Sequence, residues 1–464
     1  MIGRHCRGTS GTLRIGIKDK NALKSKFGNR TIVGLCPPAA KEPCKNEVIE
    51  MKIIVIGAGV VGLATAWRLQ RDGHHVTVID RDSGPGLGTS YANGAQLSYS
   101  YVAPLADPSV WAQLPRFLTD RGSPVQFRPG FDPFQYRWLL QFLAACTKRQ
   151  ALETVDRLGE LAALSRKVLH DSPELMAGQL HWTASGKLVV YSSEKSFVSA
   201  RKLADRQMAS GTEKRVLDRD ECLELEPALA SIADRLVGGV FAPDDETADA
   251  YQMCRRLEQL MLESANPPLF LYETAVTDFR RKGRAIEAIE TDRGSYTADL
   301  VVLAAGAGAR ALGQRLGLDL PIYPIKGYSL SVPVAREAAA PRVSVTDAAR
   351  KIVLARLGNS LRLAGAADIV GYDLDIDHRR TSKLITDATS DFPEAADWQK
   401  AELWAGLRPA TPTGQPIVGS TPVDNLLVNV GHGALGFTLA LGTAQRLADL
   451  IAGSAGRFRS AASP

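Results

Sequence analysis

The sequence has little cysteine and no long run of apolar residues. Its six cysteines are scattered: Cys6, Cys36, Cys44, Cys146, Cys222 and Cys254. No two of them have the close spacing of a zinc site, and their order does not resemble a disulfide framework. A membrane-spanning helix needs about 20 consecutive apolar residues, and no run approaches that length. We therefore expect a protein of a reducing compartment without a transmembrane helix, and we expect no metal site.

The body of the chain also lacks a basic excess. The first 50 residues hold ten Lys and Arg against four Asp and Glu, an excess equal to the net charge of +6 of the whole chain. Residues 51–464 are therefore neutral overall, which argues against a nucleic-acid partner, because such proteins need a basic surface. The 464 residues leave room for two or three domains with sizeable cores.

Residues 1–50 are polar and basic and show no sustained periodicity. Three interpretations compete. A targeting leader is disfavoured because acidic residues are present and no arginine-rich amphipathic helix is evident. A disordered tail is the second interpretation, and a non-native extension with translation starting at Met51 is the third. We favour the third, which mass spectrometry of the native N-terminus would test.

The most informative segment covers residues 51–80, MKIIVIGAGVVGLATAWRLQRDGHHVTVID. Residues 52–56 are apolar and rich in β-branched side chains, a pattern that predicts a strand buried on both faces. Gly57, Gly59 and Gly62 follow as a G-x-G-x-x-G motif. In such motifs the first glycine permits the turn, the second lets a pyrophosphate approach, and the third lets the helix pack on the strand.

A helix over 60–72 and a second strand over 75–79 complete this unit, and Asp80 ends it. The helix N-terminus would face the phosphates of a ligand. Asp80 stands where an acid can hydrogen-bond an adenosine ribose. The unit predicts a bound dinucleotide but not which one. The alternative is an α/β turn whose glycines serve packing alone.

The middle of the chain alternates helical and strand-like patterns. They predict a helical stretch over 136–169, a hairpin over 181–192, helices over 194–210 and 250–263, strands over 270–276 and 278–289 with a turn at 282–283, and a strand over 296–303. The last strand runs into AAGAGAR at 304–310. Small residues there permit either close approach to a cofactor or a packing turn, and both interpretations stay open.

The C-terminal third predicts an antiparallel sheet from short strands over 323–332 and 351–365. A helix over 382–390, a strand over 426–430, a glycine turn at 431–433 and a helix over about 435–451 follow.

Five motifs together resemble the FAD-dependent D-amino-acid oxidase superfamily, and within it the bacterial D-amino-acid dehydrogenase small subunits. They are IIVIGAGVVGLATAW (53–67), GTSYANGAQLS (88–98), YPIKGYSLSV (323–332), GLRPATPTGQPIVG (406–419) and GHGALGFTLALGTAQRLADLI (431–451). One departure concerns the second motif, where the family more often has Ala-Gly and this chain has Gly94-Ala95. The resemblance implies non-covalently bound FAD.

By this resemblance, a set of residues would hold the FAD. They are Ile53, Ile54, Val55, Ile56, Gly57, Ala58, Gly59, Val60, Val61, Gly62, Leu63, Ala64, Thr65, Ala66 and Trp67 around the pyrophosphate, Asp80 and Arg81 at the adenosine, Ser90, Asn93, Gly94 and Gln96 along the flavin or pyrophosphate, Val276 beside the adenine, Ala305 and Gly306 at a strand end, and Gly433 and Gly436 at the last helix.

Four residues are candidates for contact with the substrate. Arg408 is expected to clamp a substrate carboxylate, since arginine can bind it through two parallel hydrogen bonds; the alternative is an arginine packed under a loop. Lys326 and Tyr328 are expected to line the same pocket or to be alternating residues of a strand. His432 would hydrogen-bond the flavin or a substrate ammonium, or be a structural turn residue.

The resemblance implies an α/β fold with a parallel-sheet, Rossmann-like FAD-binding domain over 51–135, 205–320 and 404–455, and an antiparallel substrate domain over 136–204 and 321–403. The expected reaction is oxidative deamination of D-amino acids, with a quinone as one possible electron acceptor. The resemblance also implies a cytoplasmic protein, with peripheral association at the inner membrane as a further expectation. The alternatives are an enzyme for glycine, sarcosine, proline or hydroxyproline-type substrates and a nucleotide-binding scaffold.

Overall fold

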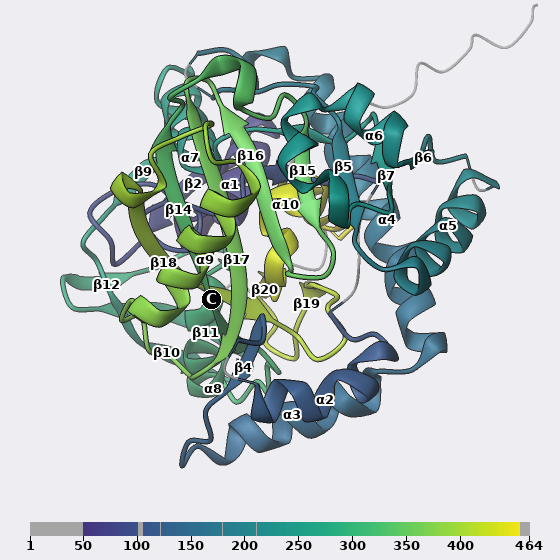
Figure 1. The fold of residues 1–464 in the computed structure, drawn as a ribbon. Helices are drawn as coiled ribbons and strands as arrows, with labels where there is room; N and C mark the ends of the chain where they lie inside the picture. Colours follow the sequence, from purple (N-terminus) through teal and green to yellow (C-terminus); the bar gives the residue numbers. More distant parts are fainter. Residues whose placement is uncertain (1–49, 101–104, 121, 179, 210, 455–464) are drawn as a thin grey trace, which may run out of the picture. The chain divides into compact units, whose positions relative to one another are not determined.

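The computed structural model describes residues 50–100, 105–120, 122–178, 180–209 and 211–454 (Figure 1). The α-helices of these residues are α1 (Val60–Arg71), α2 (Ser109–Thr119), α3 (Pro133–Ala145), α4 (Lys148–His170), α5 (Glu194–Ala209), α6 (Arg219–Leu225), α7 (Ala250–Leu262), α8 (Ala309–Arg315), α9 (His378–Asp391) and α10 (Gly436–Gly453). The expectations for residues 1–49 lie outside the described residues.

Six of the described strands form a mainly parallel sheet in the order β19-β20-β13-β1-β2-β9. They are β1 (Lys52–Ile56), β2 (His75–Ile79), β9 (Leu269–Leu271), β13 (Leu300–Leu303), β19 (Ile417–Ser420) and β20 (Leu426–Val430). Only β19 runs antiparallel to its neighbour in this sheet of the described chain. Strand β1 confirms the apolar strand predicted over 52–56. It lies in the middle of this sheet, where other helices or strands cover both of its faces.

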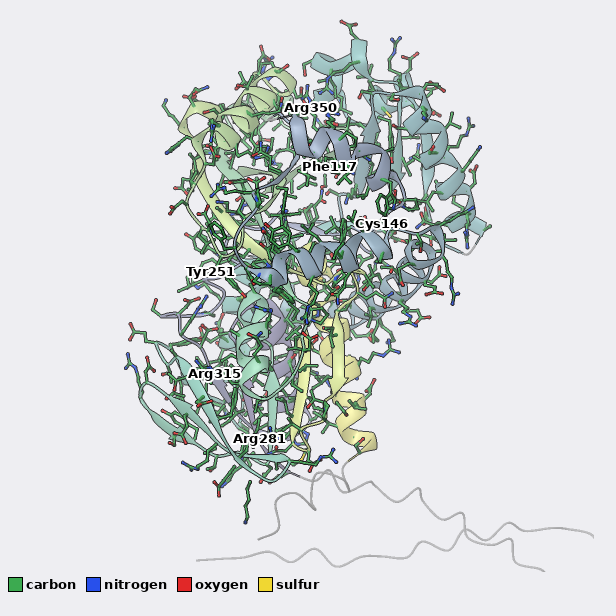
Figure 2. The ribbon with its side chains drawn as sticks, turned by 90° about the horizontal axis from the view of Figure 1, so that it is seen from below. Phe117, Cys146, Tyr251, Arg281, Arg315 and Arg350 are labelled. Carbon is green, nitrogen blue, oxygen red and sulfur yellow. The ribbon has the colours of Figure 1, made fainter. Side chains whose placement is uncertain are left out.

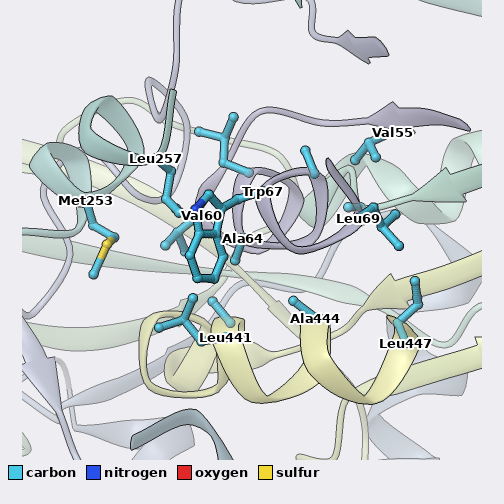
Figure 3. Packing of buried hydrophobic residues seen from close by; sticks show 14 of the residues in the cluster. Val55, Val60, Ala64, Trp67, Leu69, Met253, Leu257, Leu441, Ala444 and Leu447 are labelled. Atoms are coloured by element: carbon cyan, nitrogen blue, oxygen red, sulfur yellow. The ribbon is translucent and has the colours of Figure 1, made fainter. Parts of the chain in front are cut away.

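Helices α1 and α10 cover one face of this sheet, α7 packs on α1, α4 packs on α10, and the four helices form one apolar core with the sheet. Trp67 of α1 is the largest side chain at their junction. Figure 3 shows its ring beside Leu257 of α7 and Leu441 of α10. This packing holds the N-terminal end of α1 in place beside the ends of the strands.

The described residues also form two small sheets. One consists of β10 (Val276–Lys282), β11 (Ala285–Thr291) and β12 (Gly294–Tyr296), and the other of β3 (Gln96–Leu97) and β8 (Glu246–Thr247). In Figure 2, Arg281 of β10 and Arg315 of α8 lie at one end of the ribbon, and Arg350 lies at the other end.

Nine strands form a second, mostly antiparallel sheet in the order β18-β14-β17-β16-β15-β5-β7-β6, with β4 paired to β17. They are β4 (Val125–Phe127), β5 (Lys187–Tyr191), β6 (Arg215–Asp218), β7 (Gly238–Ala242), β14 (Tyr323–Pro333), β15 (Ser344–Asp347), β16 (Ile352–Leu357), β17 (Ser360–Ile369) and β18 (Glu402–Ala410). Helix α9 packs on β14 and β17. The predicted α/β fold with one parallel and one antiparallel sheet is confirmed.

Three local expectations are wrong. The hairpin over 181–192 is absent from the described chain: only β5 forms there, and it pairs with β7 and β15 from distant parts of the sequence. The strand over 270–276 ends at Leu271, and the strand over 296–303 is split into β12 and β13, which belong to different sheets. In each case a long-range pairing partner decides the strand, and local alternation does not reveal that partner.

The division into two domains stays a prediction. Strands β6 and β7 lie in the segment assigned to FAD binding, yet both pair within the nine-stranded sheet. Helix α4 lies in the segment assigned to the substrate domain and packs against α10.

Candidate active site

A cavity of about 590 Å³ lies between the two large sheets. One wall is built from the carboxyl ends of β1, β2, β13 and β20, where ligands of open α/β sheets bind. The other wall is built from β14, β17 and β18 of the antiparallel sheet. The cavity therefore brings together motifs that are hundreds of residues apart in the sequence.

Two of the three glycines of the first motif, Gly57 and Gly62, have the steric roles that their spacing predicts. Gly57 has a φ of +116°, and a Cβ built on it would come within 2.5 Å of the carbonyl oxygen of Ala304. A Cβ on Gly62 would lie 1.8 Å from the carbonyl oxygen of Gly57, so this glycine is required for packing. A Cβ on Gly59 would meet only the hydroxyl of Ser90, at 3.6 Å. Gly59 thus leaves an open approach to the N–H groups of the first turn of α1, as a pyrophosphate requires.

Asp80 closes this glycine turn from the end of β2. Its carboxylate accepts a hydrogen bond from the N–H of Ala58 at 2.5 Å and another from the N–H of Asp82 at 2.9 Å. Burial raises the pKa of Asp80, and these two N–H groups act in the opposite direction. The carboxylate lines the cavity beside Arg81. A hydrogen bond to a ribose therefore stays a prediction for a group that also stabilises the turn.

The cavity collects most, but not all, of the predicted residues. Those that line it are Ile56, Gly57, Ala58, Gly59, Val60, Val61, Asp80, Arg81, Ser90, Asn93, Gly94, Val276, Ala305, Gly306, Tyr328, Arg408, His432, Gly433 and Gly436. Those that do not line it are Ile53, Ile54, Val55, Gly62, Leu63, Ala64, Thr65, Ala66, Trp67, Gln96 and Lys326. Most of the second set form the interior of β1 and α1, so they support the turn and do not contact the cavity.

The second motif folds back on itself beside the cavity. The side-chain oxygen of Asn93 accepts a hydrogen bond from the N–H of Ala95 at 3.0 Å. Ala95 has a φ of +56°, in the left-handed region that favours glycine. A glycine at position 95 would suit this conformation better. Gln96 instead bonds Ser344 of β15 and so joins the motif to the antiparallel sheet.

Arg408 projects from β18 into the cavity. Strand β18 pairs with β14 so that Arg408 lies opposite Ile325, and its guanidinium covers Gly327. One guanidinium nitrogen donates to the carbonyl oxygen of Ala366 at 2.8 Å. Ala366 has a φ of +61° and lies at an irregularity in the pairing of β17 with β14. Such bulges change the direction in which groups of a strand point. Here the bulge directs the carbonyl oxygen of Ala366 toward the guanidinium of Arg408.

The charge of Arg408 has no carboxylate partner among the ion pairs of the described residues. Burial lowers the pKa of Arg408, and the more distant Asp368 opposes this shift. A partly desolvated guanidinium that faces a cavity is suited to an anionic ligand, since a carboxylate would supply the missing counter-charge.

Lys326 and Tyr328 project to the other side of β14, because side chains alternate along a strand. The hydroxyl of Tyr328 donates to Asp368 at 3.0 Å, and Asp368 also accepts from Arg380 at 2.7 Å. The ammonium of Lys326 donates to the carbonyl oxygen of Asp375 at 2.9 Å. Tyr328 still borders the cavity, but its hydroxyl is engaged in this buried network, and Lys326 does not reach the cavity.

His432 lies in the glycine turn before α10, and it is 3% exposed. Burial lowers the pKa of His432 to about 3, so its ring is neutral at ordinary pH. One ring nitrogen lies 3.2 Å from the hydroxyl of Thr443. Gly431 and Gly433 have φ values of +81° and +55°, which let the turn pass beside the cavity before the helix begins.

The sequence patterns missed several lining residues, among them Trp404, Leu407 and Leu374. Gly406 was a usable signal: a Cβ on it would lie 2.0 Å from the ring of Trp404, so the glycine makes room for the indole. The hydroxyl of Thr89 donates to the carbonyl oxygen of Leu407 at 2.7 Å and joins the second motif to β18, a contact that no sequence pattern indicates.

The family model described as FAD dependent oxidoreductase matches residues 52–450. The chain belongs to this family. It is therefore an FAD-dependent oxidoreductase, and the glycine turn and the cavity beside it fit this cofactor. None of the three described cysteines, Cys146, Cys222 and Cys254, lines the cavity.

Curated relatives and solved structures agree with this assignment. D-amino acid dehydrogenase 2 of Ralstonia nicotianae is 45% identical over 414 residues, covering 87% of this chain and 96% of that protein. D-amino acid dehydrogenase 2 of Pseudomonas aeruginosa is 45% identical over 401 residues, covering 86% and 94%. The crystal structure of glycine oxidase from Geobacillus kaustophilus has a TM-score of 0.67 at 22% identity, covering 87% and 94%. The last comparison shows the shared fold.

In the described part of the chain, no helix is long and apolar enough to cross a membrane. Within the same residues, no group of three or more acidic, histidine or cysteine side chains is arranged to hold a metal ion.

Proposed function

We propose that the protein oxidises D-amino acids to 2-oxo acids and ammonia and passes the electrons to an acceptor such as a quinone. The observation that carries this proposal is the guanidinium of Arg408, which faces the cavity without a carboxylate partner among the described residues. A substrate carboxylate would complete its coordination by two parallel hydrogen bonds. The curated relatives named for D-amino acid dehydrogenation support the substrate class.

When bound, FAD would accept the hydride from the substrate Cα. The chain's own residues then have to bind, orient and exclude water. Arg408 would fix the carboxylate, and its bond to Ala366 limits the directions in which the guanidinium can move. This restraint favours one orientation of Cα, because a clamp with fewer rotamers loses less entropy on binding.

The glycine turn before α10 would supply electrostatic stabilisation. Its backbone N–H groups and the N-terminal end of α10 lie at the cavity, where a helix dipole favours developing negative charge. His432 is too acidic, as an imidazolium, to hold a proton from the substrate ammonium. Solvent would take that proton before the oxidation, so the chain needs no basic side chain for this step.

Anaerobic mixing with substrate tests the proposal. The yellow colour of the purified protein should bleach with D-alanine and not with L-alanine. Bleaching by glycine, sarcosine, proline or hydroxyproline in place of D-alanine would favour the alternative amino-acid substrates. A protein that binds FAD but is bleached by none of these compounds would favour the nucleotide-binding scaffold and would overturn the proposal.

Substitution of Arg408 by Lys separates a clamp from a packed arginine. A clamp predicts that KM rises by about 100-fold or more while FAD stays bound, since lysine cannot make two parallel hydrogen bonds. Arg281→Lys is the control, because Arg281 is an exposed arginine of β10 outside the cavity. Arg81 is unsuitable as a control because it lines the cavity. An unchanged KM in Arg408→Lys would remove the assignment.

The acceptor and the cellular location need a separate test. Turnover with a quinone analogue without oxygen, compared with turnover in air, would distinguish a dehydrogenase from an oxidase. Location in the cytoplasm and peripheral association with the inner membrane stay predictions of the resemblance, which fractionation of cells would test.

A further inference from the structure

The segment of residues 371–377, which joins β17 to α9, borders the cavity. It carries no helix or strand, and Leu374 at its centre lines the cavity while remaining 51% exposed. The hydroxyl of Tyr372 donates to the carbonyl oxygen of Ala307 at 3.1 Å. Ala307 belongs to the cavity wall that follows β13. The segment therefore spans from the antiparallel sheet to the cofactor side of the cavity.

The buried Lys326 anchors this segment to β14. Lys326 is 1% exposed, and its ammonium lies 3.2 Å from the carboxylate of Asp373 and 2.9 Å from the carbonyl oxygen of Asp375. Asp373 also accepts from Arg128 at 3.2 Å and from the N–H of Asp375 at 2.9 Å. Burial of a lysine is costly unless its charge is paired. Here the pairing fixes the main chain on both sides of Leu374.

We propose that Leu374 determines which substrate side chains the cavity accepts and that Lys326 is a positioning residue that holds Leu374 there. The inference rests on the proposed function. With the carboxylate at Arg408 and Cα directed at the cofactor, the substrate side chain must lie against the remaining walls. Trp404, which lies on the same face of β18 as Arg408, and Leu374 make those walls apolar. Leu374 is the more exposed of these two, so it forms the outer limit for a long side chain.

The favoured substrates are therefore D-amino acids with apolar side chains of medium length. A methylene group in an apolar pocket contributes about tenfold or more to discrimination between substrates. A charge at position 374 would remove this contribution for D-leucine and would attract a cationic side chain such as that of D-lysine.

Leu374→Asp tests this assignment, with kcat/KM for D-alanine as the internal reference. The ratio for D-leucine over D-alanine should fall by about tenfold or more, and the ratio for D-lysine over D-alanine should rise. Leu374→Ser should lower the first ratio in the same direction if the acidic variant does not hold FAD. Leu140→Asp is the matched control, because Leu140 is an exposed leucine of α3 outside the cavity.

The outcomes separate the two claims. If the wild type oxidises D-amino acids and the ratios of both Leu374 variants match those of Leu140→Asp, the inference is overturned alone. If the wild type oxidises no D-amino acid, the proposed function is overturned and this inference falls with it.

Lys326→Met tests the positioning role, since methionine fills the space without a charge. Loss of the anchor should reduce the D-leucine over D-alanine ratio and should shrink the further effect of Leu374→Asp in the double variant. Asp373→Ala loosens the same segment without changing the buried lysine and should give the same shift. A lower melting temperature with an unchanged ratio in both variants would show a purely structural lysine and would contradict the proposal.

Discussion

The guanidinium of Arg408 lies against the backbone of Gly327, on the neighbouring strand of the antiparallel sheet. A Cβ built on Gly327 would come within 2.3 Å of one guanidinium nitrogen and 2.5 Å of the central carbon. The glycine thus leaves the space that the arginine needs in order to face the cavity. The two residues belong to different motifs, so this contact links the motifs: the position of the Arg408 side chain requires a glycine at position 327.

Gly327→Ala should therefore impair substrate binding without removing FAD. The added methyl group displaces Arg408, and a displacement of about 1 Å at a positioning residue can cost about 100-fold in kcat/KM. Steady-state kinetics and the flavin absorbance measure the two effects separately. Gly159→Ala in α4 is the matched control, since a Cβ there meets nothing within 4 Å. Normal kinetics in Gly327→Ala would show that Arg408 tolerates the shift.

Two glycines of the first motif, Gly59 and Gly62, should differ in what their substitution affects: FAD binding for the first and stability for the second. Gly59→Ala should fold normally and bind FAD more weakly by about tenfold or more, because the new methyl group occupies the open approach to α1. Gly62→Ala should destabilise the apoprotein by about 1–3 kcal/mol or more, because its methyl group would meet the carbonyl oxygen of Gly57.

Thermal unfolding of the apoproteins and fluorescence titration with FAD check this pair. Wild-type FAD affinity in Gly59→Ala would mean that the cofactor does not approach this position.

The unit over 51–80 could be predicted from the sequence because its information is local. The apolar strand, the three glycines and the helix act within 30 residues, and two of the glycines, Gly57 and Gly62, are required by close contacts with the backbone. Arg408 could be singled out because the GLRP motif is specific. The positions of its partners could not, since Ala366 reaches it through a bulge that no local pattern marks.

Lys326 and Tyr328 show the limit of such predictions. Their motif correctly predicts a strand, but a shift of one residue decides which face a side chain occupies. The pairing of β14 with β18 puts Arg408 and Gly327 at the cavity and turns Lys326 to the opposite face. The position of Leu374 at the cavity could not be predicted, because the segment around it has neither a periodic pattern nor a motif.

His432 gives a prediction about pH. Its pKa is about 3 in the folded protein, because of burial, against 6.5 for the unfolded chain. Between these values the unfolded chain binds more protons, so stability is lost as the pH falls from about 6.5 toward 3. Each pH unit in this range costs about 1.4 kcal/mol, or about 2 kcal/mol between pH 7 and pH 5.

Urea denaturation of the FAD-loaded protein at these two pH values measures the loss. His432→Gln lacks the titrating ring and should lose about 2 kcal/mol less than the wild type over the same interval. Equal losses in the two proteins would contradict a neutral, buried His432.

Tyr328→Phe distinguishes a structural tyrosine from a catalytic one. The Tyr328 hydroxyl donates to Asp368, whose other oxygen is held by Arg380. Burial raises the pKa of Asp368, so removal of one donor makes its charged form still less favourable. We expect a loss of about 1–3 kcal/mol in the free energy of unfolding and a change in kcat of less than about threefold. Tyr136→Phe is the control, because that hydroxyl bonds a carbonyl oxygen at an exposed site. A large fall in kcat at unchanged stability would instead place the Tyr328 hydroxyl at the substrate.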